Sequence, residues 1–348
     1  MRIVQLGPYA RPTGGVRAHV VLLRRFLLQR QVPCAVINLS RYRDDAEDEV
    51  YYPRNALELL WLLLRIRCDV LHLHIGGTLP LRLLALGMIC SLRPGAKTVL
   101  TFHSGGYPSS EEGRSARPSS FRGFVLRRFD RLIAVNPELA DFYHRLGCSP
   151  DRTRLICPHA FLPAAIDTGD PLPRRLRTFW EAHSPRLLTV GQLEPEYDLA
   201  MQIDVLPRIR ETHPHAGLAI IGAGTLEGEM RDRIRAAPHG EHVLLCGDVP
   251  HASTLRAIEE CDLLLRTTLY DGDSIAVREA LHLGAPVIAT DNGMRPPGVR
   301  LVRPRCPSAL EEAIDEVLAA PAAPGSRSSE PDEQNLEALL AVYRELTE

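Results

Sequence analysis

Short apolar runs recur along the first half of the chain, and each ends in a polar or glycine-rich break. They are RIVQL (2–6), CAVINL (34–39), DVLHLH (69–74), TVLTFH (98–103) and RLIAVN (131–136). Runs of this length, rich in Val, Ile and Leu, are typical of strands buried on both faces of a parallel sheet. The segments between them have helical periodicity, so the first half predicts a doubly wound α/β domain.

The second half repeats this plan. Its apolar runs are RLLTVG, GLAIIG, HVLLCG, DLLLRT and PVIATD, with helices expected to begin near Leu199, Leu226, Ser253 and Ser274. We therefore predict two Rossmann-like domains, residues 1–163 and 164–330, that face each other across a cleft. A last helix within 331–348 is expected to pack back on the first domain. The joint falls in the proline-rich stretch 158–173.

Two polar segments separate these elements. The segment 105–120 follows a strand end and has almost no apolar residues. A long loop at that place suggests a substrate lid. The segment 320–333 has the composition of a linker.

Length and composition narrow the class of protein. A chain of 348 residues suits two domains. The eight cysteines form no CxxC pair and no zinc spacing, which predicts buried, reduced thiols. No apolar stretch reaches the length of a membrane span. The opening MRIVQLGPYA has a strand pattern rather than that of a secretion signal, so we expect a cytoplasmic location. Attachment to the inner face of the membrane is compatible with this expectation.

Charge is unevenly divided along the chain. The first 163 residues hold 23 of the 41 Lys and Arg residues but only 13 of the 43 Asp and Glu residues. This excess suggests an anionic partner, such as a phospholipid surface, a lipid-linked phosphate or an acidic glycan. Dispersed surface charge is the alternative.

One basic segment is a candidate for membrane contact. A helix within 121–131 would carry Phe121, Phe124, Val125 and Phe129 among several arginines. Such a helix could dock peripherally on a membrane. It could equally be a core helix with an arginine-rich outer face.

Ligands of open α/β sheets bind beyond the carboxyl ends of the strands, and glycine-rich breaks stand at those ends here. Gly14 and Gly15 close the first loop and begin a helix whose N–H groups could receive an anion. His103 ends a strand and either bonds a substrate or has a structural role. Gly222 belongs to the turn IIGAGTLEGEM, which lacks the third glycine of a dinucleotide site.

The segment LYDGDSIAVREALHLGAPVIATDNG (269–293) places two acids around a predicted helix start. Asp271 precedes the helix, and Glu279 lies in its second turn. Either Ser274 or Asp273 caps the helix, or the N–H groups of Ser274 and Ile275 bind a phosphate. A nucleotide-diphosphate sugar would use all of these groups, with its ribose at Glu279 and its sugar near Asp271.

The chain resembles glycosyltransferase family 4 over nearly its whole length, through GGV, TFHSGG, AVNPELADFY, TVGQLEPEYD, IIGAGTLEGEM and DGDSIAVREALHLGAPVIATDNG. The resemblance implies a GT-B fold and retaining transfer from a nucleotide sugar, most often a UDP-sugar, without a metal or other cofactor. It implies a donor site in the second domain and an acceptor site in the first. His103 and Asp271 would contact the donor sugar, Glu279 the ribose and the amides of 274–275 the diphosphate, with Gly15 approaching the donor.

Two departures from the family pattern bear on the chemistry. The first acid is Asp271, where the family has Glu. In GQLEPEYD, Gln192 and Tyr197 stand where the family has an Arg and a Lys that clamp the diphosphate. Such cations stabilise the leaving group in a dry site.

A replacement for this lost charge stands at the end of the run DLLLRT. Arg266 occupies a strand end that is usually apolar in the family. We expect it to bind the donor diphosphate, with Arg278 as the other candidate. The alternative is a structural pair between Arg266 and a carboxylate such as Asp262 or Asp271.

The function predicted from these features is retaining hexosyl transfer to a hydroxyl of a glycan or lipid-linked acceptor, as in polysaccharide biosynthesis. His103 and Asp271 would orient the sugar while the departing phosphate takes the acceptor's proton. A catalytically silent GT-B protein that binds a glycan or supports a partner enzyme is the alternative, and a sugar-nucleotide epimerase is a third possibility. Nucleic-acid binding is unsupported, because basic residues are not interleaved with aromatic ones at any motif.

Overall fold

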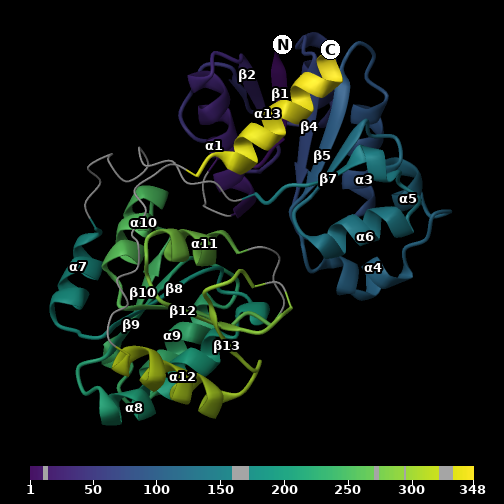
Figure 1. Ribbon diagram of the computed structural model, residues 1–348. Coiled ribbons are helices and arrows are strands. Elements are labelled where there is room, and N and C mark those ends of the chain that lie inside the picture. Colours follow the sequence, from purple (N-terminus) through teal and green to yellow (C-terminus); the bar gives the residue numbers. More distant parts are fainter. Residues whose placement is uncertain (11–14, 159–171, 270–273, 294, 321–331) are drawn as a thin grey trace. The chain divides into compact units, whose positions relative to one another are not determined.

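The computed structural model describes residues 1–10, 15–158, 172–269, 274–293, 295–320 and 332–348. The chain divides into two compact units (Figure 1): Met1–Ala160 together with Asp332–Glu348, and Phe161–Pro331. The boundary expected between residues 163 and 164 lies outside the described residues, as does most of the linker expected at 320–333.

A sheet of seven parallel strands forms the centre of the first unit, in the order β3-β2-β1-β4-β5-β6-β7. The strands are β1 (Ile3–Gly7), β2 (Cys34–Asn38), β3 (Val50–Tyr51), β4 (Val70–Ile75), β5 (Lys97–Phe102), β6 (Arg131–Ala134) and β7 (Thr153–Leu155). Every residue of β1, β2 and β4 is buried. Burial on both faces explains why these strands are apolar without alternation.

Helices cover both faces of this sheet. The core on one face includes residues of α2 (Ala56–Arg65), α3 (Leu81–Ser91), α5 (Phe121–Leu126) and α6 (Pro137–Arg145). On the other face α1 (Gly15–Gln29) packs with α13 (Gln334–Thr347). Leu340 and Tyr343 of α13 are fully buried there, and Figure 1 shows α13 in yellow across the strands. The end of the chain therefore completes the core of the first unit.

The second unit has a six-stranded parallel sheet in the order β10-β9-β8-β11-β12-β13. Its strands are β8 (Arg186–Val190), β9 (Gly217–Ile221), β10 (Val243–Gly247), β11 (Leu263–Arg266), β12 (Val287–Thr290) and β13 (Arg300–Val302). One core cluster contains α7 (Arg174–Glu181), α10 (His251–Glu260) and α11 (Ile275–His282), and the other contains α8 (Leu199–Thr212), α9 (Glu227–Ala236) and α12 (Pro307–Ala319). Helices thus cover both faces here as well.

These two units confirm the predicted α/β class. Three predicted helix starts are correct to within one residue, at Leu199, Leu226 and Ser274, whereas α10 begins two residues before Ser253. All eight cysteines are free, and five of them are buried, as expected for reduced thiols. Among the described residues, none of the helices has the length and apolar character that crossing a membrane requires.

The expectation of a long loop over 105–120 is correct only in part. The segment forms the single turn η1 (Tyr107–Ser109) and the short helix α4 (Glu111–Ser115). Ser110 caps α4 by accepting a hydrogen bond from Gly113 N at 3.1 Å. The buried ring of Tyr107 packs edge-on against Phe102 and Phe142. One aromatic anchor therefore fixes a segment whose composition is otherwise polar.

Candidate functional site

Two loops at the carboxyl ends of β8 and β9 pack backbone against backbone. Gly191 N donates to Ile221 O at 3.0 Å, and Gly222 N donates to Gly247 O at 2.9 Å. Gly222 has a φ of +140°, and a Cβ there would lie 1.7 Å from the Gly191 carbonyl oxygen. The contact between the loops therefore requires glycine at this position. Gln192, the next residue of the first loop, is exposed.

Arg266 lies at the same edge of the sheet, with only 6% of its surface exposed. Its Nη1 donates to Val190 O at 2.8 Å, and its Cζ lies 4.7 Å from the centre of the Tyr197 ring. A Cβ at Gly191 would lie 2.4 Å from that ring and 3.0 Å from Arg266 Nη1. A carbonyl oxygen and an aromatic face thus hold a buried cation at the carboxyl ends of β8 and β11.

A structural ion pair between Arg266 and Asp262 does not occur. Asp262 precedes β11, whereas Arg266 ends it, so the two lie at opposite ends of the strand. The Asp262 carboxylate accepts a hydrogen bond from Arg186 N at 2.7 Å. The other carboxylate considered for Arg266, that of Asp271, is outside the described residues.

Hydroxyl and amide groups surround this edge. Gln202 Nε2 donates to Thr267 Oγ1 at 2.7 Å. Arg295 Nη2 donates to Thr268 Oγ1 at 2.7 Å, and Arg295 Nε donates to Thr290 O at 3.1 Å. A second guanidinium is therefore fixed near the ends of β11 and β12. The sequence reasoning missed Arg295, although a cation a few residues behind a strand end was a usable signal.

The start of α11 differs in part from expectation. Ser274 occupies the N-cap position, but its side chain makes no capping hydrogen bond. Its hydroxyl is buried and has no hydrogen-bond partner among the described residues. Ile275 is the first helical residue, as predicted. Asp273, the other proposed cap, lies outside the described residues.

Glu279 is buried in the second turn of α11, with 4% of its surface exposed. Its Oε1 contacts Nε2 of His251, the first residue of α10, at 2.6 Å. The sequence reasoning missed His251, which is separated from Glu279 by 28 residues. The histidine follows the end of β10, so it lies at the same polar edge of the sheet as the other candidate residues.

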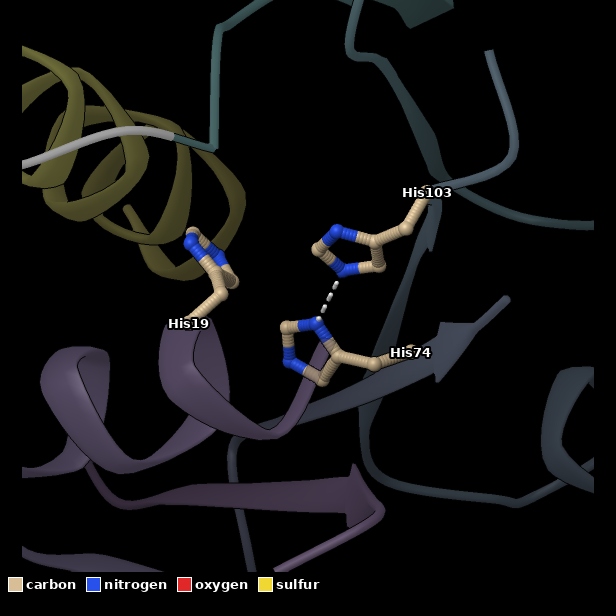
Figure 2. A group of neighbouring side chains, drawn as sticks. All are labelled: His19, His74 and His103. Atoms are coloured by element: carbon tan, nitrogen blue, oxygen red, sulfur yellow. Dashed lines mark hydrogen bonds between the residues drawn. The ribbon is translucent and has the colours of Figure 1, made fainter. Parts of the chain in front are cut away.

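A cluster of imidazoles lies at the carboxyl edge of the first sheet (Figure 2). His103 directly follows β5, His74 lies in β4 and His19 in α1. His74 Nδ1 and His103 Nε2 are 3.2 Å apart. The centre of the His19 ring lies 5.5 Å from that of His74 and 5.1 Å from that of His103. The predicted site residue His103 thus has two imidazole neighbours that sequence reasoning missed, although GGVRAHV (14–20) and DVLHLH contain them.

Burial controls the protonation of this cluster. Desolvation lowers the pKa of His19 to about 4 and holds the pKa values of His74 and His103 well below the usual range for histidine. Charge on neighbouring rings further disfavours protonation of His74 and His103. The three imidazoles are therefore neutral near pH 7.

The remaining predicted site residues are Gly14, Gly15 and Asp271. Gly15 is the first residue of α1 and is exposed. Gly14 and Asp271 lie outside the described residues. The structure brings Gly222 and Arg266 to one edge of the second sheet, where α11 presents Ser274 and Glu279, whereas His103 belongs to the first unit.

Two doubly wound units with polar groups gathered at strand ends define a protein of the GT-B architecture. Residues 13–159 match the family model described as Glycosyltransferase Family 4, and residues 177–329 match that of Glycosyl transferases group 1. Together these matches cover most of the chain. The chain belongs to the family-4 type of glycosyltransferases, which confirms the resemblance found in the sequence.

Curated relatives match over part of the chain. Glycogen synthase of Mycobacterium tuberculosis (strain H37Rv) is 30% identical over 151 residues, which are 41% of this chain and 36% of the relative. The amylovoran biosynthesis glycosyltransferase AmsK of Erwinia amylovora is 28% identical over 117 residues, 32% of this chain and 29% of the relative. The chain thus spans about a third of the length of the curated relatives it matches.

Solved structures match the whole fold. Anabaena Alr3699/HepE, in complex with UDP and glucose, has a TM-score of 0.67 at 15% identity, covering 100% of this chain and 97% of that chain. Sucrose-phosphate synthase from Thermosynechococcus elongatus has a TM-score of 0.68 at 17% identity, covering 99% of this chain and 96% of that chain. These likenesses confirm the GT-B fold.

The loop contact at Gly222 leads to a prediction about stability. In Gly222→Ala the new Cβ would overlap the Gly191 carbonyl at a φ that L-residues rarely adopt. We expect a loss of more than about 3 kcal/mol in the unfolding free energy of the second unit, measured by denaturant titration. In the control Gly228→Ala the Cβ meets nothing within 4 Å in a helix, so stability should stay equal or rise slightly. Equal effects of the two substitutions would refute the role given to Gly222.

Proposed function

We propose that the chain is a retaining glycosyltransferase that moves a hexosyl group from a nucleotide-diphosphate sugar to a hydroxyl of a glycan or lipid-linked acceptor. The buried guanidinium of Arg266 at the strand ends carries this proposal, in a chain whose two units both match glycosyltransferase families. A fixed cation there suits a departing diphosphate. The HepE complexes with UDP and with UDP-glucose support a UDP-sugar as the favoured donor.

We assign the donor to the second unit, at the start of α11. The first N–H groups of this helix, at Ser274 and Ile275, suit the diphosphate, since a helix N-terminus attracts anions. The buried hydroxyl of Ser274 has no partner among the described residues and could join them. Glu279 would bind the ribose with the carboxylate oxygen that His251 does not hold. His251 therefore orients this carboxylate in the proposal.

Arg266 would supply the charge that Gln192 and Tyr197 lack. The Tyr197 ring lies against the Arg266 guanidinium and helps to fix its position. In the proposal, Tyr197 replaces one of the family's cations and at the same time supports Arg266, which supplies the missing charge. Arg295, held by Thr268 and Thr290, is a further cation at the same edge. Buried and preorganised cations stabilise developing charge more strongly than mobile surface ones.

The sugar would be oriented by His103 and Asp271, with Gly15 and its loop near the donor. Because burial keeps His103 neutral, it would act as a hydrogen-bond partner of sugar hydroxyls. The departing phosphate would take the proton of the acceptor hydroxyl, so the proposal names no separate general base and no metal. The first unit would bind the acceptor.

A catalytically silent GT-B module is the second candidate function. Glu279 is already paired with His251, and Arg266 with the Val190 carbonyl. Contacts of this kind are also expected if the former donor-binding residues now only stabilise the fold. Donor binding separates the two candidates.

The role of Arg266 is tested by calorimetric titration with UDP, GDP and ADP in the absence of metal. We expect UDP to bind at micromolar concentration and Arg266→Ala to weaken it about tenfold to hundredfold, equivalent to roughly 1.4–2.8 kcal/mol. Arg235→Ala, at an exposed pair with Asp232 in α9, is the control and should not change affinity. An unchanged UDP affinity in folded Arg266→Ala would contradict the assignment. If that variant is unstable, Arg266→Lys serves instead.

Support for a membrane-associated acceptor comes from one face of the first unit. The helices that cover this face expose many large apolar side chains. We call these side chains together the apolar face. They are Leu57, Leu60, Trp61 and Leu64 of α2, Ile89 of α3, Leu81 at its start and Leu92 just after it, and Phe121 and Phe124 of α5. Leu57 is 79% exposed and Leu64 71%. Exposed large apolar side chains gathered on the helices of one face mark candidate interaction sites.

Basic residues border the apolar face. Arg65 lies over the Trp61 ring at 5.0 Å, and Arg54, Arg67 and Arg82 are exposed nearby in sequence. Arginines around an exposed apolar stripe suit an anionic lipid surface. We propose that this face contacts the membrane that holds a lipid-linked acceptor, at its cytoplasmic side.

The expected docking helix over 121–131 is only partly correct. The helix α5 ends at Leu126. Phe121 and Phe124 are exposed, but Val125 and Phe129 are buried in the core. Most of the exposed large apolar side chains of this face belong to α2 and α3.

Membrane contact is tested by sedimentation with lipid vesicles. We expect binding to vesicles that contain phosphatidylglycerol, weaker binding to pure phosphatidylcholine, and a loss of about tenfold in the double variant Leu57→Gln/Leu64→Gln. Leu28→Gln, on the exposed side of α1 at the opposite face of the sheet, is the control. Equal binding by the double variant and the control would contradict the proposal. A dimer that dissociates in the double variant would identify a second copy as the partner instead.

A further inference from the structure

We propose that His19, His74 and His103 bind a divalent cation that prefers nitrogen ligands, with Zn²⁺ as the representative ion. One ring nitrogen of each residue lies within 4.8 Å of the other two (Figure 2). The three side chains come from three different elements, α1, β4 and the residue after β5. A rigid sheet edge and a packed helix therefore hold the group together.

The hydrogen bond of His19 indicates which nitrogen would bind. His19 Nδ1 lies 2.8 Å from Pro158 O. Because a carbonyl oxygen only accepts, Nδ1 carries the proton and Nε2 has the lone pair. This Nε2 is buried and has no partner among the described residues. A second nitrogen anchored to a backbone carbonyl is the usual arrangement of a metal-bound histidine.

The spacing of the other two residues fits a metal site. A zinc–nitrogen bond of about 2.0–2.1 Å in tetrahedral geometry separates two ligand nitrogens by about 3.4 Å. His74 Nδ1 and His103 Nε2 are 3.2 Å apart. The His19 ring would have to approach by on the order of an ångström, which a small rotation of its side chain supplies.

The surroundings select the kind of cation. The ring of His72 lies beside that of His74, with ring centres 3.9 Å apart and planes tilted by 34°, but Tyr343 and Thr101 contact its two ring nitrogens. It therefore supports the cluster without being a ligand. The cluster of described residues contains no carboxylate, which favours Zn²⁺, Cu²⁺ or Ni²⁺ over Mg²⁺ or Ca²⁺. Burial keeps the imidazoles neutral, the form that binds metals.

Metal binding would remove His103 from the sugar. This consequence rests on the proposed function, in which transfer needs no metal and His103 contacts the donor sugar. Zn²⁺ would then be an inhibitor, reversed by a chelator. The binding itself is independent of the transfer reaction, so the two are tested by different measurements.

The test is a titration of the chelator-treated full chain with Zn²⁺ and Co²⁺, followed by calorimetry and by the visible absorption of bound Co²⁺. We expect one tight site, a rise in melting temperature with Zn²⁺, and a loss of at least tenfold in affinity in His19→Gln and in His74→Asn.

The control is the exposed group His239, Glu241 and His242, which also could hold an ion. His239 has a φ of +65°, which Asn tolerates, so His239→Asn/Glu241→Gln should fold and keep the tight site. Loss of the tight site in this control variant would overturn the proposal. So would the absence of micromolar Zn²⁺ binding by the wild type, a result that needs no variant to fold.

Discussion

Strands that are buried on both faces leave room for polar chemistry only at their ends. In both units the strands are parallel, so their carboxyl ends meet at one edge, where loops and helix starts supply polar groups. The first unit gathers neutral imidazoles at this edge, and the second gathers guanidinium, hydroxyl and carboxylate groups. The positions of the candidate residues that the structure describes follow from this constraint.

In the proposed donor site of the second unit, Arg266 would replace a lost charge without moving the site. Arg266 ends β11 with its guanidinium against the Val190 carbonyl of the neighbouring strand. Tyr197, which by the family resemblance stands in the place of a cation, has its ring against the guanidinium. A buried arginine needs such partners, because an isolated charge in a dry interior is unstable. The cation is therefore fixed in place before any ligand binds.

Much of this fold was predictable from the apolar pattern. Runs such as CAVINL and GLAIIG are long enough to span a buried strand, and the polar or glycine-rich residues that follow mark the loops. The helix within 105–120 was not predictable, because Tyr107 is fixed in part by packing against Phe142 of α6, which is distant along the chain. Local composition contains no information about that contact.

The candidate site was predictable only in part, because contacts between distant segments cannot be read from local sequence. Arg266 stood out because a charged residue ended an apolar run, but the run did not reveal its contacts with the Val190 carbonyl and the Tyr197 ring. The pair of Glu279 with His251 depends on how α10 packs beside α11. His72 and His74 are two positions apart in one strand, and only the tertiary structure shows that α1 brings His19 to the same place. Side-chain partners from different elements lie beyond what spacing along the chain can predict.

The central claim is retaining transfer from a nucleotide sugar, and the most direct test is the anomeric configuration of the first-formed product. The chain would be incubated with α-linked UDP-hexoses in the presence of a chelator, with water or a glycan as acceptor, and followed by proton NMR. The account predicts that the α configuration is kept in the first-formed product. A first-formed β product, or the absence of turnover with any UDP-, GDP- or ADP-hexose, would contradict it.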